Sequence, residues 1–328
     1  MIRVVIVGLG GIGRRHLANI RAAEPDAQIT VLRHLRADSS VPAGANRVVY
    51  SLDDALATQP DVAFVCGPTS THAEAGMAFA RAGVHLFVEK PLALDLTDAQ
   101  RLVEASNAAG RMLIVGYNLR FCASLRALHA AAHAGRIGRI MSGRAEVGLY
   151  LPDWRPGIDY RTTNSARAEF GGGVALELSH EIDYMRWLLG EVATVDAIVG
   201  RFGDLDIDVD DTAELLLSFT GGGIGSIHMD MTQRSPTRTC RLIGTTGTLT
   251  WDGIAGETQA FDHAEGWTTL VAGGSEGRNT MYLAEIAHVF ACIRGESAPF
   301  ADGLTGARVV QIAQAAVHAA REGRRIVV

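Results

Sequence analysis

The stretch Ile2-Arg3-Val4-Val5-Ile6-Val7-Gly8-Leu9-Gly10-Gly11-Ile12-Gly13 opens the chain and decides its fold. Its first half is short, β-branched and mostly apolar, which predicts a strand buried on both faces. The second half has the pattern G-x-G-x-x-G, and residues 14–23 have a helical pattern. A strand, a glycine turn and a helix in this order predict a turn that binds the pyrophosphate of a dinucleotide.

Each glycine of this turn has its own expected role. Gly8 allows the tight turn, Gly10 lets the backbone approach a pyrophosphate, and Gly13 lets the helix pack closely on the strand. Gly11 and Ile12 are further candidates for cofactor contacts, because they lie just before the helix, at the end whose dipole favours negative charge. The alternative is a glycine-rich turn that binds nothing, but the strand before it and the helix after it favour a nucleotide.

Composition indicates a globular enzyme of about two domains. The chain has 328 residues, of which 48% are hydrophobic and 20% charged, and its formal net charge is −6. It shows no basic run typical of nucleic-acid binding, no apolar stretch that predicts a membrane span and no signal peptide. The four cysteines are widely spaced, without the pattern of a metal site or a disulfide framework. We therefore expect reduced thiols, no metal and a cytoplasmic location.

The pattern along the chain changes near residue 120. Before it, strands alternate with helices, two of which Ser51 and Asp95 can cap, and this alternation predicts a doubly wound parallel sheet. After it come a helix over 175–189, consecutive strands with glycine turns, and closing helices over 281–294 and 305–322. We predict a dinucleotide-binding Rossmann domain over 1–120 and an α+β substrate domain over 121–328, with a large, mainly antiparallel, open sheet.

Two polar segments are candidates for chemistry. Lys90, in Glu89-Lys90-Pro91, follows an apolar strand, and ligands of parallel sheets bind at the carboxyl ends of strands. Its ammonium group can hydrogen-bond a substrate hydroxyl while hydride leaves the same carbon. The alternative is a solvated lysine at a strand end.

The second segment follows Gly171-Gly172-Gly173. On the helix expected there, Glu177, His180 and Asp183 share one side. His180 can take a proton from a hydroxyl while a carboxylate orients its ring. The alternative is a histidine within a row of salt bridges on a helix face.

The end of the second strand bears on the choice of dinucleotide. An NAD site usually has an acid there, about twenty residues after the glycines. This chain has Arg33-His34-Leu35-Arg36 instead, with no acid before Asp38. Basic contacts from Arg33 and His34 favour the 2′-phosphate of NADP over NAD. The alternative is that Arg33 stacks on the adenine and both cofactors bind.

Taken together, the motifs resemble the Gfo/Idh/MocA family of oxidoreductases. They are, in order, Gly8 to Gly13, Gly67-Pro68-Thr69-Ser70-Thr71-His72, Glu89-Lys90-Pro91, Gly116-Tyr117-Asn118-Leu119-Arg120-Phe121, and Gly171-Gly172-Gly173 running into His180-Glu181-Ile182-Asp183. The resemblance implies hydride transfer between a nicotinamide and a sugar-like substrate, and an open sheet that often forms the oligomer interface.

The resemblance also implies roles for single residues. Lys90 and His180 match the catalytic lysine and histidine of the family. Pro68, Thr69 and His72 match the cofactor loop, and Glu89 is expected near the nicotinamide ribose. Many members carry an aspartate four residues before the histidine, where this chain has Leu176, with Glu177 one residue later. Glu177 therefore stays a candidate for the catalytic carboxylate.

The remaining candidates bind substrate. Trp154, Arg155, Tyr160 and Arg161 lie in or after Leu151-Pro152-Asp153-Trp154-Arg155-Pro156, a loop resembling a family branch involved in surface-polysaccharide sugars. Aromatic faces and guanidinium groups suit a hydroxylated ring with negative charge; the alternative is a surface loop held by salt bridges. Asn118, Arg120 and Asp183 are further candidates.

These observations leave three hypotheses for function. The first is an NAD(P)-dependent oxidoreductase of a sugar, nucleotide sugar or cyclitol, assembled as a homodimer or homotetramer through the apolar open sheet. The second is a redox-neutral NAD-dependent glycosidase or eliminase. The third is a non-catalytic nucleotide-sensing protein, which would be expected to lack Lys90 or His180.

Overall fold

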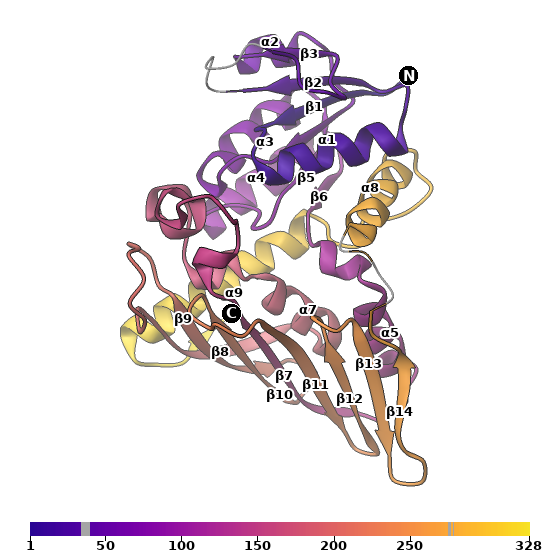
Figure 1. The fold of residues 1–328 in the computed structure, drawn as a ribbon, viewed down its shortest axis with the longest axis vertical. Coiled ribbons are helices and arrows are strands. Elements are labelled where there is room, and N and C mark those ends of the chain that lie inside the picture. Colours follow the sequence, from indigo (N-terminus) through magenta and orange to yellow (C-terminus); the bar gives the residue numbers. More distant parts are fainter. Residues whose placement is uncertain (34–39, 275–276, 278) are drawn as a thin grey trace. The chain divides into compact units, whose positions relative to one another are not determined.

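The computed structural model describes residues 1–33, 40–274, 277 and 279–328 (Figure 1). The chain divides into two compact units, Met1–Asn118 with Asn279–Val310 and Leu119–Arg278 with Gln311–Val328. Residues 279–310, predicted from the sequence to belong to the second domain, are thus part of the first unit. In the described ranges, no helix has both the length and the apolar character needed to cross a membrane.

The first unit is built on a sheet of six parallel strands in the order β3-β2-β1-β4-β5-β6. The order reverses between β1 and β4, which makes the carboxyl ends of these two strands the usual place for a ligand. The predicted doubly wound Rossmann fold is confirmed. The strands are β1 (Arg3–Val7), β2 (Gln28–Leu32), β3 (Arg47–Val49), β4 (Val62–Val65), β5 (His85–Val88) and β6 (Leu113–Val115).

Local sequence explains where the helices of this unit begin. The side chains of Ser51 and Asp95 accept hydrogen bonds from the backbone N–H groups of Asp54 and Asp98, at 3.1 and 2.8 Å. Both predicted caps are therefore confirmed. The helices are α1 (Gly11–Ala23), α2 (Leu52–Leu56), α3 (His72–Arg81), α4 (Leu96–Ala108) and α8 (Thr280–Ile293).

Helix α8 joins the first unit because its apolar face completes the core of that unit. Ile286, Val289 and Phe290 are buried in one cluster with Phe64 and Phe87 of the parallel sheet. Burial of apolar surface stabilises the folded state by roughly 25 cal/mol per Å², which favours packing of a segment distant in sequence into the core. Helix α9 (Gly303–Glu322) contributes residues to both units.

The second unit contains a nine-stranded sheet in the order β14-β13-β12-β11-β7-β10-β9-β8-β15 (Figure 1). Among the described strands of this second sheet only β7 and β10 pair in parallel, so the prediction of a mainly antiparallel sheet is confirmed. The strands are β7 (Ile140–Gly148), β8 (Val192–Gly200), β9 (Thr212–Phe219), β10 (Ile224–Asp230), β11 (Thr237–Gly244), β12 (Gly247–Asp252), β13 (Glu257–Asp262), β14 (Gly266–Val271) and β15 (Ile326–Val327).

Helices cover one face of this sheet and leave the other open. The covering helices are α5 (Ala123–His133), α6 (Val174–Glu177) and α7 (His180–Leu189). Helix α5 is tied to the sheet by Trp251, whose Nε1 donates to Ser124 Oγ at 2.9 Å. On the open face, Ile198, Leu216 and Ile224 are each more than 60% exposed.

The single helix predicted over 175–189 is in fact two helices, α6 and α7. The backbone N–H groups of Ser179 and Glu181 bond the carbonyl groups three residues before them, at 3.3 Å, which tightens the chain between the helices. Glu177 therefore ends α6, whereas His180 begins α7. The prediction that Glu177 shares one continuous helix with His180 and Asp183 is therefore wrong, whereas His180 and Asp183 both lie on α7.

Candidate functional site

The glycine turn lies where β1 passes into α1, and two of its glycines are required by the protein itself. Gly8 has a φ of +88°, and a Cβ there would lie 3.0 Å from the backbone of Gly67. A Cβ at Gly13 would overlap the carbonyl oxygen of Gly8. Side chains at Gly10 and Gly11, in contrast, would meet no described atom within 4 Å.

The open side of the turn fits the pyrophosphate of a dinucleotide. Gly10 is the N-cap of α1; the described first turn contains no acid, and no side chain caps it. The first N–H groups of a helix have no partner within that helix and, with the dipole, favour an anion. Gly10, Gly11 and Ile12 would thus hold the pyrophosphate through backbone contacts.

Two matched glycine variants separate these roles. We expect Gly10→Ala to fold like the wild type but to weaken NAD(P)H binding by at least about tenfold, or about 1.4 kcal/mol. We expect Gly13→Ala to lower the free energy of unfolding by about 1–3 kcal/mol, because its new methyl group overlaps Gly8. Chemical denaturation and fluorescence titration with NADH and NADPH measure the two effects. Unchanged affinity in Gly10→Ala would place the pyrophosphate elsewhere.

Buried partners hold Lys90 at the carboxyl end of β5. Glu89 Oε1 lies 2.6 Å from His16 Nε2, and Glu89 Oε2 accepts the backbone N–H of Lys90 at 3.2 Å. His16 and Glu89 are both buried. Both carboxylate oxygens of Glu89 therefore have partners inside the unit, and its contact with the nicotinamide ribose stays a prediction. His16, absent from the sequence-based candidates, is one of those partners.

His72 links Lys90 to the loop after β4. Its Nδ1 lies 2.9 Å from the carbonyl oxygen of Pro91, and its Nε2 lies 3.0 Å from that of Gly67. Burial lowers the pKa of His72, so the ring is neutral at neutral pH and donates from one nitrogen. The ring therefore lies between two backbone segments, one of which contains Lys90, and its contact with the cofactor stays a prediction.

One signal for Lys90 in the sequence escaped the motif reasoning. Lys90 is the only lysine in the chain; every other residue among its 30 lysines and arginines is arginine. A guanidinium group stays protonated in proteins, whereas an ammonium group can release a proton. The chain thus keeps its single lysine at the strand end where proton transfer is expected.

The other predicted cofactor contacts lie at strand ends of the same unit. Pro68 precedes a 3₁₀ turn over Thr69–Thr71, in which the Thr71 hydroxyl donates to the Pro68 carbonyl group at 2.8 Å. Arg33 follows β2, and its backbone N–H bonds the Val49 carbonyl group at 3.0 Å. His34 lies outside the described residues, and so do Arg36 and Asp38.

In the second unit, the glycine run leads the chain into His180. Gly172 is packed so closely that a Cβ would lie 2.6–2.9 Å from three carbonyl oxygens of residues 164–167. Gly173 has a φ of +112° and starts α6. His180 then stands half-buried at the first position of α7. The tight glycine packing therefore sets the place of His180 in this unit.

Arg120 and Asp183, both predicted to bind substrate, bind each other. Arg120 Nε and Nη2 donate to the two carboxylate oxygens of Asp183 at 2.9 and 2.8 Å. Their side chains are only 9% and 2% exposed. The Arg120 guanidinium group also lies 5.4 Å from the centre of the Trp187 ring. The two charges therefore neutralise each other in a buried bidentate pair, and their contact with substrate stays a prediction.

Most of the predicted substrate-binding residues in the loop after Leu151 form hydrogen bonds or ion pairs with other residues of the second unit. Trp154 Nε1 donates to the Leu149 carbonyl oxygen at 3.2 Å, and the Tyr160 hydroxyl accepts the Asp206 N–H at 3.2 Å. Arg161 pairs with Asp159 at 2.7 Å, as the alternative of a loop held by salt bridges expects. Arg155 is exposed, whereas Asn118, which belongs to the first unit, is buried.

Comparison with known proteins decides the family. Residues 2–117 match the model of an oxidoreductase family with an NAD-binding Rossmann fold, and residues 125–250 match the GFO/IDH/MocA C-terminal domain. The chain is 30% identical over 289 residues to 1,5-anhydro-D-fructose reductase of Ensifer adhaerens, covering 86% of this chain and 84% of that protein. The chain belongs to the Gfo/Idh/MocA family. The predicted NAD(P)-dependent dehydrogenase or reductase is thereby confirmed at the level of the enzyme class.

Further relatives of this Gfo/Idh/MocA oxidoreductase agree. It is 31% identical over 241 residues to myo-inositol 2-dehydrogenase of Thermotoga maritima, covering 69% of this chain and 67% of that protein. The solved WlbA dehydrogenase of Bordetella pertussis, in complex with NADH and UDP-GlcNAcA, has a TM-score of 0.84 and 27% identity, with 100% and 98% of the two chains covered. Apo levoglucosan dehydrogenase, at 21% identity and a TM-score of 0.88 over 100% and 98% of the chains, shares the fold.

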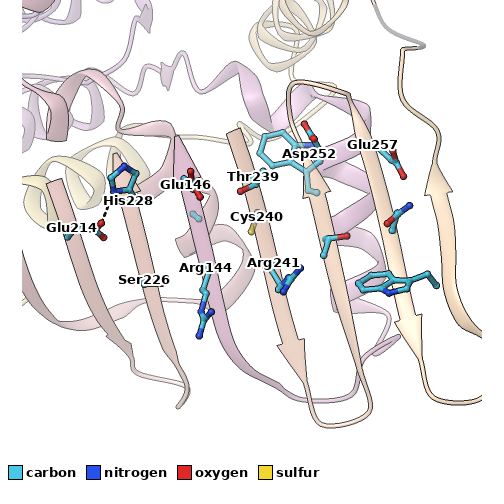
Figure 2. A pocket seen from close by; sticks show the side chains of 15 residues that line it. Arg144, Glu146, Glu214, Ser226, His228, Thr239, Cys240, Arg241, Asp252 and Glu257 are labelled. Atoms are coloured by element: carbon cyan, nitrogen blue, oxygen red, sulfur yellow. Dashed lines mark hydrogen bonds and ion pairs between the residues drawn. The ribbon is translucent and has the colours of Figure 1, made fainter. Parts of the chain in front are cut away.

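The oxidoreductase also has a hollow of about 610 Å³ on the open face of its nine-stranded sheet (Figure 2). None of the predicted catalytic, cofactor or substrate residues lines it. His228 lies there between two acids, 2.6 Å from Glu214 and 3.0 Å from Asp230. The hydrogen bonds to Asp230 and Glu214 raise the pKa of His228 to about 9, so it is positively charged at neutral pH. The lining of the hollow is therefore charged, and its Glu214 and His228 form one hydrogen-bonded group with Asp230.

Proposed function

We propose that this oxidoreductase transfers hydride between a nicotinamide dinucleotide and a hydroxyl-bearing carbon of a sugar, nucleotide sugar or cyclitol. The observation that carries the proposal is Lys90, the single lysine, held at the carboxyl end of β5 by Glu89 and clamped through Pro91 by His72. In this proposal the first unit binds the dinucleotide and the second unit recognises the substrate. The nicotinamide, when bound, accepts or gives the hydride.

The proposed roles of the chain's own residues follow from their chemistry. The Lys90 ammonium group donates a hydrogen bond to the reacting oxygen and stabilises the negative charge that develops on it. His180 takes the proton of the hydroxyl group in oxidation and returns it in reduction. Glu177 lies three residues before His180 in the sequence. In this proposal its carboxylate supports the proton exchange by His180.

The substrate class is supported by the relatives and by one exposed loop. The relatives are named for an inositol and an anhydro sugar, and the WlbA structure holds a nucleotide sugar acid. Arg155 is exposed in the loop after β7 and offers a guanidinium group for an anionic or hydroxylated ring. Because the loop after Leu151 resembles that of a family branch involved in surface-polysaccharide sugars, we extend the proposal to sugars of this kind.

For the dinucleotide we propose NADP, because Arg33 directly follows β2, where an acid would favour NAD. We expect turnover of at least one member of a panel of sugars, nucleotide sugars and cyclitols, with one reduced nicotinamide formed per substrate oxidised and with NADP preferred. Arg33→Ala should shift the ratio of the Kd values for NADPH and NADH by about tenfold or more toward NADH, because a charged hydrogen bond contributes about 1.5–3 kcal/mol.

Arg47→Ala is the matched control, because Arg47 is an exposed arginine at the amino end of neighbouring β3. Its cofactor preference should equal that of the wild type. Substrate conversion without net change in nicotinamide would contradict the redox proposal and support redox-neutral elimination. A wild-type preference for NADH would overturn the NADP proposal alone.

We also propose a homodimer or homotetramer through the open face of the nine-stranded sheet. Figure 2 shows Arg144 and Arg241 on neighbouring strands β7 and β11, where they are paired in register and exposed. Two residues further along β7 lies Glu146, in register with His228 of β10. His228 is in turn in register with Glu214 of β9. Like charges opposite one another are unfavourable in a single sheet. A two-fold interface can place the arginine row of one copy against the acidic row of the other.

The oligomer proposal predicts a clear effect of charge reversal. Arg144→Glu combined with Arg241→Glu should dissociate the assembly, as measured by sedimentation velocity at equal protein concentration. Arg126→Glu is the control, because Arg126 is exposed on α5, which packs on the opposite, covered face. A wild-type protein that sediments as a monomer would refute the proposed interface.

A further inference from the structure

A carboxyl group that the proposed chemistry does not use is buried in the first unit. Glu285 lies on α8 and is 2% exposed, and neither of its carboxylate oxygens has a hydrogen-bond partner among the described residues. The next residue, Ile286, belongs to the apolar core that contains Phe87 and Cys66. An ionised carboxylate without partners is costly in such surroundings. Burial, together with the charge of Glu89, raises the pKa of Glu285 well above its usual range.

The packing of α8 on α1 places Glu285 beside the group that holds Lys90. Tyr282, one turn before Glu285, has its ring centre 6.3 Å from that of His16 and 4.4 Å from the guanidinium carbon of Arg15. At the start of α8, the side chains of Asn279 and Asn19 exchange hydrogen bonds at 2.9 and 3.2 Å. The side of α8 that carries Tyr282 and Glu285 therefore faces α1, where His16 contacts Glu89.

The titratable groups around Glu285 come from four elements. They are Glu89 after β5, Cys66 after β4, His16 and Arg15 on α1, and Tyr282 on α8 itself. Burial, followed by the charges of Glu89 and Glu285, raises the pKa of the Cys66 thiol well above its usual range. The cluster thus combines two carboxyl groups with one imidazole in an apolar core.

Hydrogen bonding decides which of the two carboxyl groups carries a proton. Glu89 has two polar partners, because its Oε1 faces His16 Nε2 and its Oε2 accepts the N–H of Lys90. Glu285 has no described donor to stabilise a charge. Since two neighbouring carboxylates in a core cannot both ionise without a large penalty, the proton belongs on Glu285.

We propose that Glu285 is a positioning residue for Lys90: its carboxyl group is neutral and leaves the contacts of Glu89 with His16 and the Lys90 amide undisturbed. This inference rests on the proposed function of Lys90. Loss of the Glu285 proton at alkaline pH places a negative charge in this part of the core. The contacts of Glu89 are then disturbed, and its hold on the Lys90 segment weakens.

The protonation of Glu285 is tested on the protein without substrate or cofactor. The infrared difference between wild type and Glu285→Gln should contain the C=O stretching band of a neutral carboxylic acid at pH 7, and the band should disappear at alkaline pH. A band already absent at pH 7 would overturn the inference. Glu285→Leu replaces the glutamine variant if the latter does not fold.

Thermal unfolding gives an independent measure with a defined sign. Below the ordinary pKa of glutamate, Glu285 is protonated in both the folded and the unfolded chain. Above it, only the unfolded chain releases the proton, so the contribution of Glu285 to stability falls as pH rises toward its raised folded pKa. The Tm of Glu285→Gln minus that of wild type should therefore increase from pH 5 to pH 8. For Glu104→Gln, an exposed glutamate on α4, the difference should stay flat; equal pH dependence in the two variants would refute the inference.

The positioning role is tested by the pH profile of turnover. Wild type should lose kcat at alkaline pH through one ionisation that is missing in Glu285→Gln, whereas Glu104→Gln should retain the wild-type profile. An infrared band combined with identical profiles would show that Glu285 is neutral but does not position Lys90, and would overturn the inference. If Lys90→Met retained turnover, the proposed function would fail instead, while the infrared and Tm results would stand.

Discussion

A Lys90→Met variant is expected to turn over substrate about 10²–10⁴-fold more slowly than wild type, the range typical for removal of a general acid or base. Methionine has a similar length but carries no charge and no N–H group, so the reacting oxygen loses its hydrogen-bond donor. The glycine turn is untouched, and the affinity for NAD(P)H should stay close to that of wild type. Steady-state kinetics and fluorescence titration of the reduced cofactor measure the two quantities separately.

Two controls make this result specific for the Lys90 ammonium group. Lys90→Arg keeps the positive charge and an N–H donor, so we expect it to be less impaired than Lys90→Met, with the remaining loss due to its larger, planar guanidinium group. Because Lys90 is the only lysine, an amine-acylating reagent modifies only Lys90 and the N-terminal amine. Loss of activity should follow the modification of Lys90 as measured by mass spectrometry. Turnover near the wild-type rate in Lys90→Met would remove Lys90 from the proposed mechanism.

An Asp183→Asn variant is expected to lower the free energy of unfolding by roughly 3–5 kcal/mol, because it leaves the guanidinium group of Arg120 buried without its counter-charge. Equilibrium denaturation of the protein without substrate measures this effect. Asp159→Asn breaks the exposed pair with Arg161 and serves as the control. Its cost should be ~1 kcal/mol or less.

A double variant separates a structural pair from a substrate contact. Arg120→Met combined with Asp183→Leu removes both charges, and its stability should exceed that of Asp183→Asn, since apolar replacements of a buried pair are often tolerated. If Asp183→Asn instead kept wild-type stability and lost only substrate affinity, the sequence-based prediction of a substrate contact would be right and the pair would not be structural.

The parts of the fold that were predictable depend on neighbours in sequence. The run from Ile2 to Gly13 and the caps Ser51 and Asp95 act within one strand or one helical turn, so their spacing predicts their geometry. Gly8 and Gly13 illustrate this, because the turn brings them against each other within six residues. Lys90 was identified for the same reason, as a polar residue directly after an apolar strand.

The parts that were not predictable depend on residues far apart in the chain. Arg120 and Asp183 are separated by 63 positions, and His16 and Glu89 by 73. A charged residue in an isolated motif looks available for a ligand until its partner is known. The break between α6 and α7 escaped prediction as well, because residues 174–189 have a continuous helical pattern and the turn at Ser179 shows only in the backbone bonds.

By itself, the sequence determined that this chain has a Rossmann unit with a dinucleotide turn, a second unit with an open sheet, and one lysine at a strand end. These features are set by periodicity and local sterics, which act over a few residues. Only the tertiary structure decided that Arg120 and Asp183 neutralise each other, that Glu89 braces Lys90 with His16, and that residues 279–310 bring Glu285 to that cluster. The physical reason is that burial changes the free energy of every charge, and burial is known only once distant segments have packed together.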